Sequence, residues 1–134
     1  MKLPAHVLFR KELSLLIWKP HGILDQELVN EIVAFVDAAE ERAQKPFNRF
    51  ADLSALDAVD LNFNFVFHIA LHRRLVFDSH PPVKTAFYVT SPDTSHYAKL
   101  HAMLTDHSPL HVSLFTERDA AAKWLGVPVE ALRV

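Results

Sequence analysis

The sequence predicts a single α/β domain with a mostly parallel sheet covered by helices. Short apolar segments typical of strands alternate along the chain with segments of helical periodicity, as in repeated βαβ units. The 134 residues, half of them apolar, suffice for one sizeable core. We therefore expect one domain over residues 1–134, with about five mostly parallel strands, one antiparallel edge strand and about four helices.

Two short strand candidates begin the chain, at about residues 6–11 and 13–19. The charged residues 10–12 between them predict a hairpin or a turned edge strand. The second segment, LSLLIWK, is almost continuously apolar, which is typical of a central strand covered on both faces. Asp25 is well placed to cap the next helix, whose apolar stripe should lie on the sheet with Glu40 outside that stripe.

Residues 47–62 combine a strand, a polar turn and a helix start. The carboxyl ends of strands in an α/β sheet are the usual place for ligands and partners. We expect a partner-binding surface here, formed by Asp52, Ser54, Asp57, Asp60 and Asn62. The alternative is purely structural, because Asp and Ser are common turn and cap residues, and Asp60 could simply cap the helix that follows.

The helix predicted over residues 62–79 is apolar on two sides. One stripe, expected to pack on the sheet, contains Phe63, Val66, Phe67, Ala70 and Phe77. The other needs a neighbouring helix, a bound ligand or a second subunit to cover it. We expect it to form a homodimer interface or a ligand groove made by Phe65, Ile69, His72, Arg73 and Val76.

The remaining elements follow the same alternation. Residues 83–90 predict another mostly apolar strand, and Ser91 begins a third helix. The last strand is expected at residues 111–115, and Gly126 can close the final helix in the left-handed conformation.

Known catalytic and metal-binding patterns are incomplete. His68 and His72 are four residues apart on a helix, but no HExxH pattern or third ligand accompanies them, so no metal site is expected. A hydrolase would need Ser54 with a histidine and an acid, yet no nucleophile elbow is present. The sequence contains only two glycines, too few for a glycine-rich phosphate-binding loop. We expect no catalytic residues, no cofactor and no enzymatic activity.

Charge and hydropathy restrict the classes of partner and the cellular location to be expected. The formal net charge of −2 provides no field that would attract nucleic acid. No segment approaches the roughly 18 apolar residues of a transmembrane helix, and the amino end reaches charged residues too soon for a secretory signal. Cysteine is absent, which excludes disulfides and thiolate sites. The default expectation is a cytoplasmic protein.

Three motifs are spread over residues 13–126: DLS at residues 52–54 followed by Asp60, HGILD at residues 21–25, and VSLFTERDAAAKWL at residues 112–125. Together they resemble the SpoIIAA-like proteins of the STAS superfamily, which are related to bacterial anti-sigma-factor antagonists. The first motif is similar to the family's DLS-like strand end and its Asp-Ser-Ser-Gly turn. Residues 21–25, HGILD, are similar to the Gly-x-Leu-Asp turn before the first helix. Residues 112–125, VSLFTERDAAAKWL, resemble the phenylalanine strand and Ala-x-x-Trp-Leu ending.

The resemblance implies a non-enzymatic regulatory or protein-interaction domain that contacts a protein partner or a second copy of itself. Leu61 stands where the family has its phosphorylated serine, and leucine cannot accept phosphate. The alternative is a small carrier or sensor for an apolar or amphipathic, lipid-like ligand. In that case Arg73, Arg74 or His72 would meet the ligand head group beside the helix at 62–79.

Overall fold

The computed structural model describes residues 3–77 and 81–133, apart from the side chain of Phe77. The strands are β1 (Val7–Arg10), β2 (Leu15–Trp18), β3 (Gly22–Leu24), β4 (Asn48–Asp52), β5 (Leu56–Val59), β6 (Val83–Tyr88) and β7 (Leu110–Phe115). The α-helices are α1 (Gln26–Ala43), α2 (Phe63–Phe77), α3 (Pro92–Leu104) and α4 (Arg118–Leu125). Short 3-10 helices span Lys11–Leu13 and Val129–Leu132.

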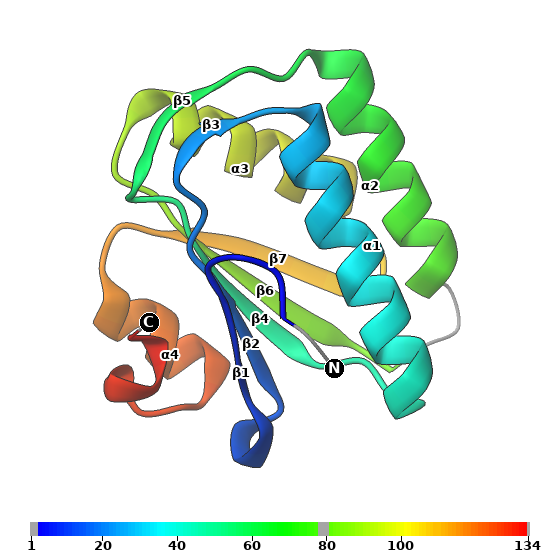
Figure 1. Cartoon of the computed structure of the whole chain (residues 1–134), viewed down its shortest axis with the longest axis vertical. Helices are drawn as coiled ribbons and strands as arrows, with labels where there is room; N and C mark the ends of the chain where they lie inside the picture. The colour runs from blue at the N-terminus through cyan, green and yellow to red at the C-terminus, as the bar shows by residue number, and fades with distance from the viewer. Residues whose placement is uncertain (1–2, 78–80, 134) are drawn as a thin grey trace.

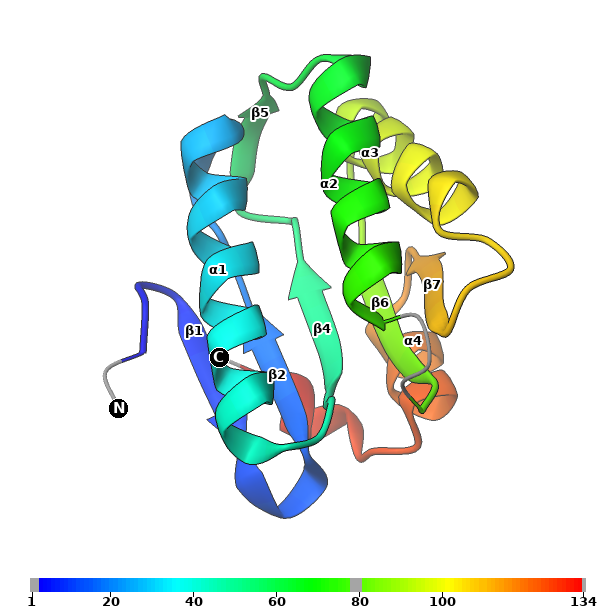
Figure 2. The same ribbon diagram turned by 90° about the vertical axis from the view of Figure 1, so that its right-hand side faces the viewer.

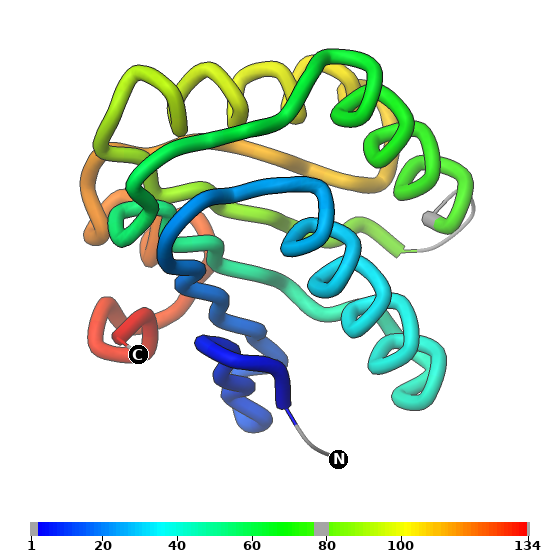
Figure 3. Tube along the Cα trace, turned by 45° about the horizontal axis from the view of Figure 1, so that its top comes forward, coloured from blue at the N-terminus to red at the C-terminus, as the bar shows by residue number. Residues whose placement is uncertain are grey.

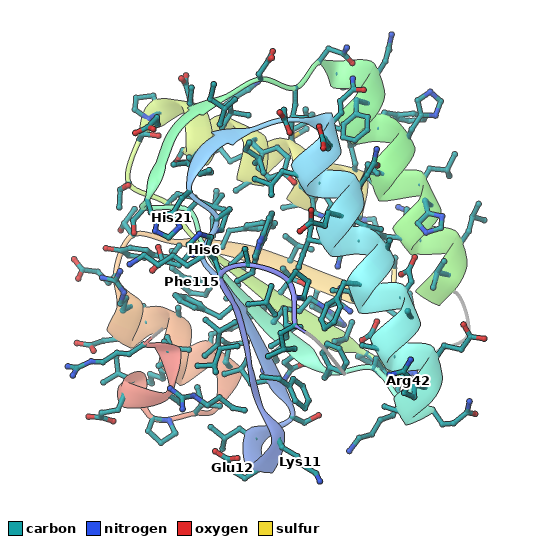
Figure 4. All side chains as sticks on the ribbon, in the orientation of Figure 1. His6, Lys11, Glu12, His21, Arg42 and Phe115 are labelled. Carbon is teal, nitrogen blue, oxygen red and sulfur yellow. The ribbon has the colours of Figure 1, made fainter. Side chains whose placement is uncertain are left out.

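The main sheet has the strand order β1-β2-β4-β6-β7. β1 pairs with β2 in the antiparallel direction, and every other neighbouring pair in this sheet is parallel. The turn between β1 and β2 carries Lys11 and Glu12 at its tip (Figure 4) and needs Ser14 in the left-handed conformation, with φ of 49°. The predicted α/β fold with one antiparallel edge strand is confirmed.

Helices cover both faces of the sheet unequally. Figure 1 shows α1, α2 and α3 on one face and α4 with the carboxyl end on the other, and the trace in Figure 3 shows the same separation. Alternate residues of β2 therefore enter different cores: Leu16 and Trp18 lie under the three helices, whereas Leu15 and Ile17 face α4. This two-sided burial explains the continuous apolar pattern of the segment.

A second, smaller sheet pairs β3 with β5 in parallel. The sequence predicted only a polar turn between the strand and the helix start of residues 47–62, and that prediction is wrong for residues 56–59, which form β5. The two strands contain three and four residues, too few for alternation to become visible in the sequence. Their pairing is extended by the backbone nitrogen of Asp60, which donates to the carbonyl of Leu24 at 2.8 Å.

The predicted helix ends are largely confirmed. The Asp25 carboxylate accepts a hydrogen bond from the Leu28 nitrogen at 3.0 Å and begins α1. Ser91 caps α3 together with Thr94, and Gly126, with φ of 75°, closes α4. Asp60 was a candidate cap for α2, but the structure differs. The amide oxygen of Asn62 accepts a hydrogen bond from the Phe65 nitrogen at 2.8 Å and caps the helix.

The predicted inward stripe of α2 is only partly correct. Val66 and Ala70 are buried as expected, but Phe63 and Phe67 are 57% and 42% exposed. Residues four apart advance by about 40° around a helix, so a stripe at this spacing turns away from the sheet. The side chain of Phe77 lies outside the described part of the chain.

Truncation of the centre of the sheet should be costly. Phe50 is completely buried in the core under α4, so Phe50→Ala should lower the free energy of unfolding by roughly 3 to 5 kcal/mol. Phe63→Ala is the matched control, because this exposed phenylalanine should matter by only about 0.5 kcal/mol. Urea denaturation of both variants measures the difference. Equal midpoints would contradict this placement of the core.

Candidate ligand-binding site

A hollow lies between the sheet and the layer of α1, α2 and α3. Its volume is about 60 Å³. Figure 2 shows β4 running behind the seam between α1 and α2. Side chains from this strand and from both helices line the hollow. The lining is provided by strands β2, β4 and β6 and by all three helices.

The cavity has two chemically different ends. The apolar end lies over β2 and under α1, and is lined by Leu16, Trp18, Val29, Ile32, Val33 and Val36. The polar end lies over β6 and under α2 and α3, and is lined by Arg73, Thr85, Tyr97 and His101. Because the sheet order places β4 between β2 and β6, the two ends face each other across β4. The cavity is therefore amphipathic along its length.

A buried ion pair joins α1 to β4 beside this cavity. Both Glu40 carboxylate oxygens accept from Arg49 Nη2, at 2.9 and 2.8 Å, and one also accepts from the Phe47 nitrogen at 2.8 Å. Burial lowers the pKa of Arg49, while the Glu40 charge and hydrogen bonds oppose that change. Glu40 was predicted outside the buried stripe of its helix, and that prediction is wrong: the pair satisfies both charges and makes burial possible.

Arg73 is buried without a comparable partner. Its Nη1 donates to His101 Nε2, and its Nη2 lies 3.4 Å from the Thr85 hydroxyl. Among the described residues, no carboxylate forms an ion pair with it. Burial, followed by repulsion from Arg49, lowers the pKa of Arg73 from 12.5 to about 9. Arg73 thus brings to the cavity a positive charge that no described carboxylate contacts directly.

His101 completes the polar end as a neutral imidazole. Arginine can only donate, so Nε2 of His101 must accept the hydrogen bond and the ring proton must be on Nδ1. Burial, with repulsion from Arg73 and Arg49, holds the pKa of His101 well below its usual value. Nδ1 is buried and has no hydrogen-bond partner in the part of the chain described. The imidazole therefore offers an unused N–H.

Tyr97 lies next to these two residues on the first half of α3. Burial raises its pKa to about 12, so the hydroxyl stays protonated and can donate. Its ring and that of His101 both pack edge-on against Phe87, with centroid distances of 5.9 and 5.7 Å. This aromatic packing fixes the orientation of the polar groups.

The residues predicted to form a groove follow the side of α2 that faces α1. Ile69 and Arg73 line the cavity, and Phe65 packs against the same core. Nε2 of His72 lies 2.8 Å from the Asp37 carboxylate of α1, which places this contact at the seam between the two helices. Val76 lies in a neighbouring hollow at the end of α1. These five positions belong to one seam within the chain.

The residues predicted to bind a partner have mixed surroundings. Asp52 is 2% exposed and accepts from the Ser54 backbone and hydroxyl at 3.0 and 2.6 Å. Its other oxygen accepts from Arg118 of α4 at 2.9 Å, and the Arg118 guanidinium lies 4.4 Å from the Tyr88 ring centre. Asp52 and Ser54 therefore serve the fold through contacts with each other and with α4.

The rest of that predicted surface is open. Asp57 on β5 is exposed, and Asp60 and Asn62 line a shallow hollow together with Leu61 and the first residues of α1. His68 and His72 do not gather further ligands, and no group of three or more potential metal-binding side chains occurs in the described ranges. Partner binding by Asp57, Asp60 and Asn62 stays a prediction.

Removal of the buried charge should stabilise the protein. Arg73→Met keeps an unbranched side chain but removes a cation without a counter-charge, so the free energy of unfolding should rise by about 1 to 4 kcal/mol. The folded-state pKa lies below the unfolded value, so the penalty is complete below a pH of about 9 and is relieved at higher pH. The gain should therefore shrink as the pH rises above about 9.

Arg42→Met is the control for this substitution. Arg42 is exposed on the last turn of α1 (Figure 4), so its replacement should change stability by only about 0.5 kcal/mol. Denaturation curves at several pH values provide the comparison. Destabilisation by Arg73→Met would show that the chain compensates this charge itself.

Comparison with known proteins supports the fold. No family model and no curated protein matches the sequence. A solved structure that resembles this one is an uncharacterised protein of the DUF3478 family with a SpoIIAA-like fold, from Shewanella loihica PV-4. The alignment has 16% identity, a TM-score of 0.59, and covers 93% of this chain and 98% of the other. None of the helices described here has the length and apolar character of a membrane span. The chain has a SpoIIAA-like fold.

Proposed function

We propose that this SpoIIAA-like domain is a non-enzymatic binding domain, a carrier or sensor for a small amphipathic molecule. The observation that carries the proposal is the cavity under α1, α2 and α3, apolar over β2 and cationic over β6. A mostly apolar pocket with a few convergent polar groups is the usual form of a small-molecule site. The volume of the cavity, about 60 Å³, lies below the roughly 300 to 1,000 Å³ of sites for drug-sized ligands, so the ligand must be a small molecule.

The polar end is suited to holding a molecule rather than to reacting with it. Arg73 and Tyr97 are donors, and the imidazole of His101 already accepts from Arg73. The Thr85 hydroxyl lies near Arg73, and no base in the described ranges forms a hydrogen bond with it. A nucleophile needs a base within hydrogen-bond reach, and no such pair lines the cavity among the described residues. This arrangement favours binding without catalysis.

Filling the cavity should abolish binding. Ala51 of β4 lines the hollow, so the larger side chain in Ala51→Leu should occupy its centre and leave the fold intact. Native mass spectrometry of protein purified from its host, before and after organic extraction, should show a removable small molecule on the parent but not on this variant. Ala43→Leu, on the exposed last residue of α1, is the control and should retain the molecule.

Circular dichroism of each variant separates loss of binding from loss of folding. A parent protein that carries nothing before extraction, and binds no amphipathic probe afterwards, would refute the proposed function.

A protein-interaction role is the second candidate, and a different surface favours it. Four apolar side chains recur every fourth residue along the outside of α2 and are 42% to 70% exposed: Phe63, Phe67, Leu71 and Leu75. The Phe63 and Phe67 rings stack with centroids 6.2 Å apart. Contiguous exposed apolar surface often marks an interaction site. This outer stripe replaces Phe65, Ile69 and Val76 as the better candidate for a homodimer or partner contact.

A single charged substitution tests whether the outer stripe mediates self-association. Leu71→Asp should leave the free energy of unfolding within about 0.5 kcal/mol of the parent, because Leu71 is 43% exposed. It should nevertheless weaken any self-association measured by sedimentation velocity. Ile23→Asp introduces the same charge at an exposed apolar residue of β3 and should have no such effect. A parent that sediments as a monomer at all concentrations would exclude the homodimer.

A further inference from the structure

We propose that the molecule bound in this cavity is a short-chain monocarboxylate, with its carboxylate held by Arg73 and His101 and its alkyl chain under α1. The inference rests on the proposed function and specifies the ligand of the same site. Three properties of the cavity support this inference: the charges around Arg73, the hydrogen-bond donors at the polar end, and the distance between the polar and apolar ends.

The surroundings of Arg73 favour an anion. Arg49 is paired with Glu40 through two contacts below 3.0 Å. The Asp37 carboxylate also lines the hollow, but it contacts His72 and its side chain is 30% exposed. Among the described residues no carboxylate forms an ion pair with Arg73, and a monoanion bound beside it would supply that partner.

The hydrogen-bond inventory also points to an acceptor. A guanidinium has five N–H groups, and among the described residues only His101 and Thr85 accept from those of Arg73. His101 contributes the unpartnered Nδ1–H, and the protonated Tyr97 hydroxyl can donate as well. A carboxylate accepts through two oxygens and binds arginine in a forked geometry, which an alcohol or an amine cannot do.

The size of the site restricts the chain. Two inter-strand spacings separate β2 from β6, so the apolar and polar ends are about 10 Å apart. That distance suits a carboxylate with a short alkyl chain better than a long-chain fatty acid. The side chains of Val29, Ile32 and Val36 would contact the chain from above, while Leu16 and Trp18 would support it from the sheet.

The test compares three probes of equal length: hexanoate, 1-hexanol and hexylammonium, each titrated calorimetrically into the extracted protein. Hexanoate should bind about 10- to 100-fold more tightly than hexanol, the range expected for hydrogen bonds to a charged group. Arg73→Met should remove this preference while leaving hexanol binding within a few-fold. Arg42→Met should behave like the parent. Because Arg73→Met is expected to be the more stable protein, loss of hexanoate binding cannot be attributed to unfolding.

His101→Phe provides an independent variant, since it keeps the aromatic packing but removes the N–H. It should weaken hexanoate binding and spare hexanol binding. If hexanol or hexylammonium binds the parent as tightly as hexanoate, the carboxylate assignment is overturned and the proposed function survives. If none of the three binds, and the protein from its host carries no small molecule, the proposed function itself fails. An unchanged hexanoate preference in Arg73→Met would also overturn the assignment.

Discussion

The Glu40–Arg49 pair is the constraint on which the rest of this face of the domain depends. It ties the last turns of α1 to the first half of β4 and satisfies the Phe47 nitrogen where the chain enters the sheet. Because the pair is neutral overall, Arg73 is the buried cation that has no ion-pair partner among the described residues. Breaking a buried pair by removing one partner costs several kcal/mol. Both the position of α1 and the electrostatics of the cavity are therefore set by this contact.

Much of the fold was predictable because its determinants are local. The continuous apolar run of β2 and the cap residues Asp25, Ser91 and Gly126 act within a few positions of themselves. The β3–β5 sheet was missed because such short strands are defined by their partner rather than by their own pattern. The exposed Phe63 and Phe67 were misplaced for a geometric reason, since a stripe at four-residue spacing gradually rotates around the helix.

The site was less predictable, because its groups come from distant segments. Arg73 was a candidate from its place on α2, but Thr85, Tyr97 and His101 join it only through the packing of β6 and α3. His101 is 2% exposed, which its position in the sequence does not indicate. One signal was present in the sequence: Arg49 alternates with Phe50 inside a predicted strand, and a charge buried there requires a buried counter-charge. The pattern could not show that Glu40 supplies it.

The unbalanced charge of Arg73 also bears on the lifetime of the protein in the cell. A molecule that binds only the folded state stabilises it by mass action, increasingly as its concentration exceeds the dissociation constant. An anion bound beside Arg73, as proposed above, would offset the cost of burying that cation, so binding would lower the population of unfolded chains available to proteases. The amount of the domain would then follow the supply of the proposed ligand, and turnover itself would report that supply without any change of shape at the surface.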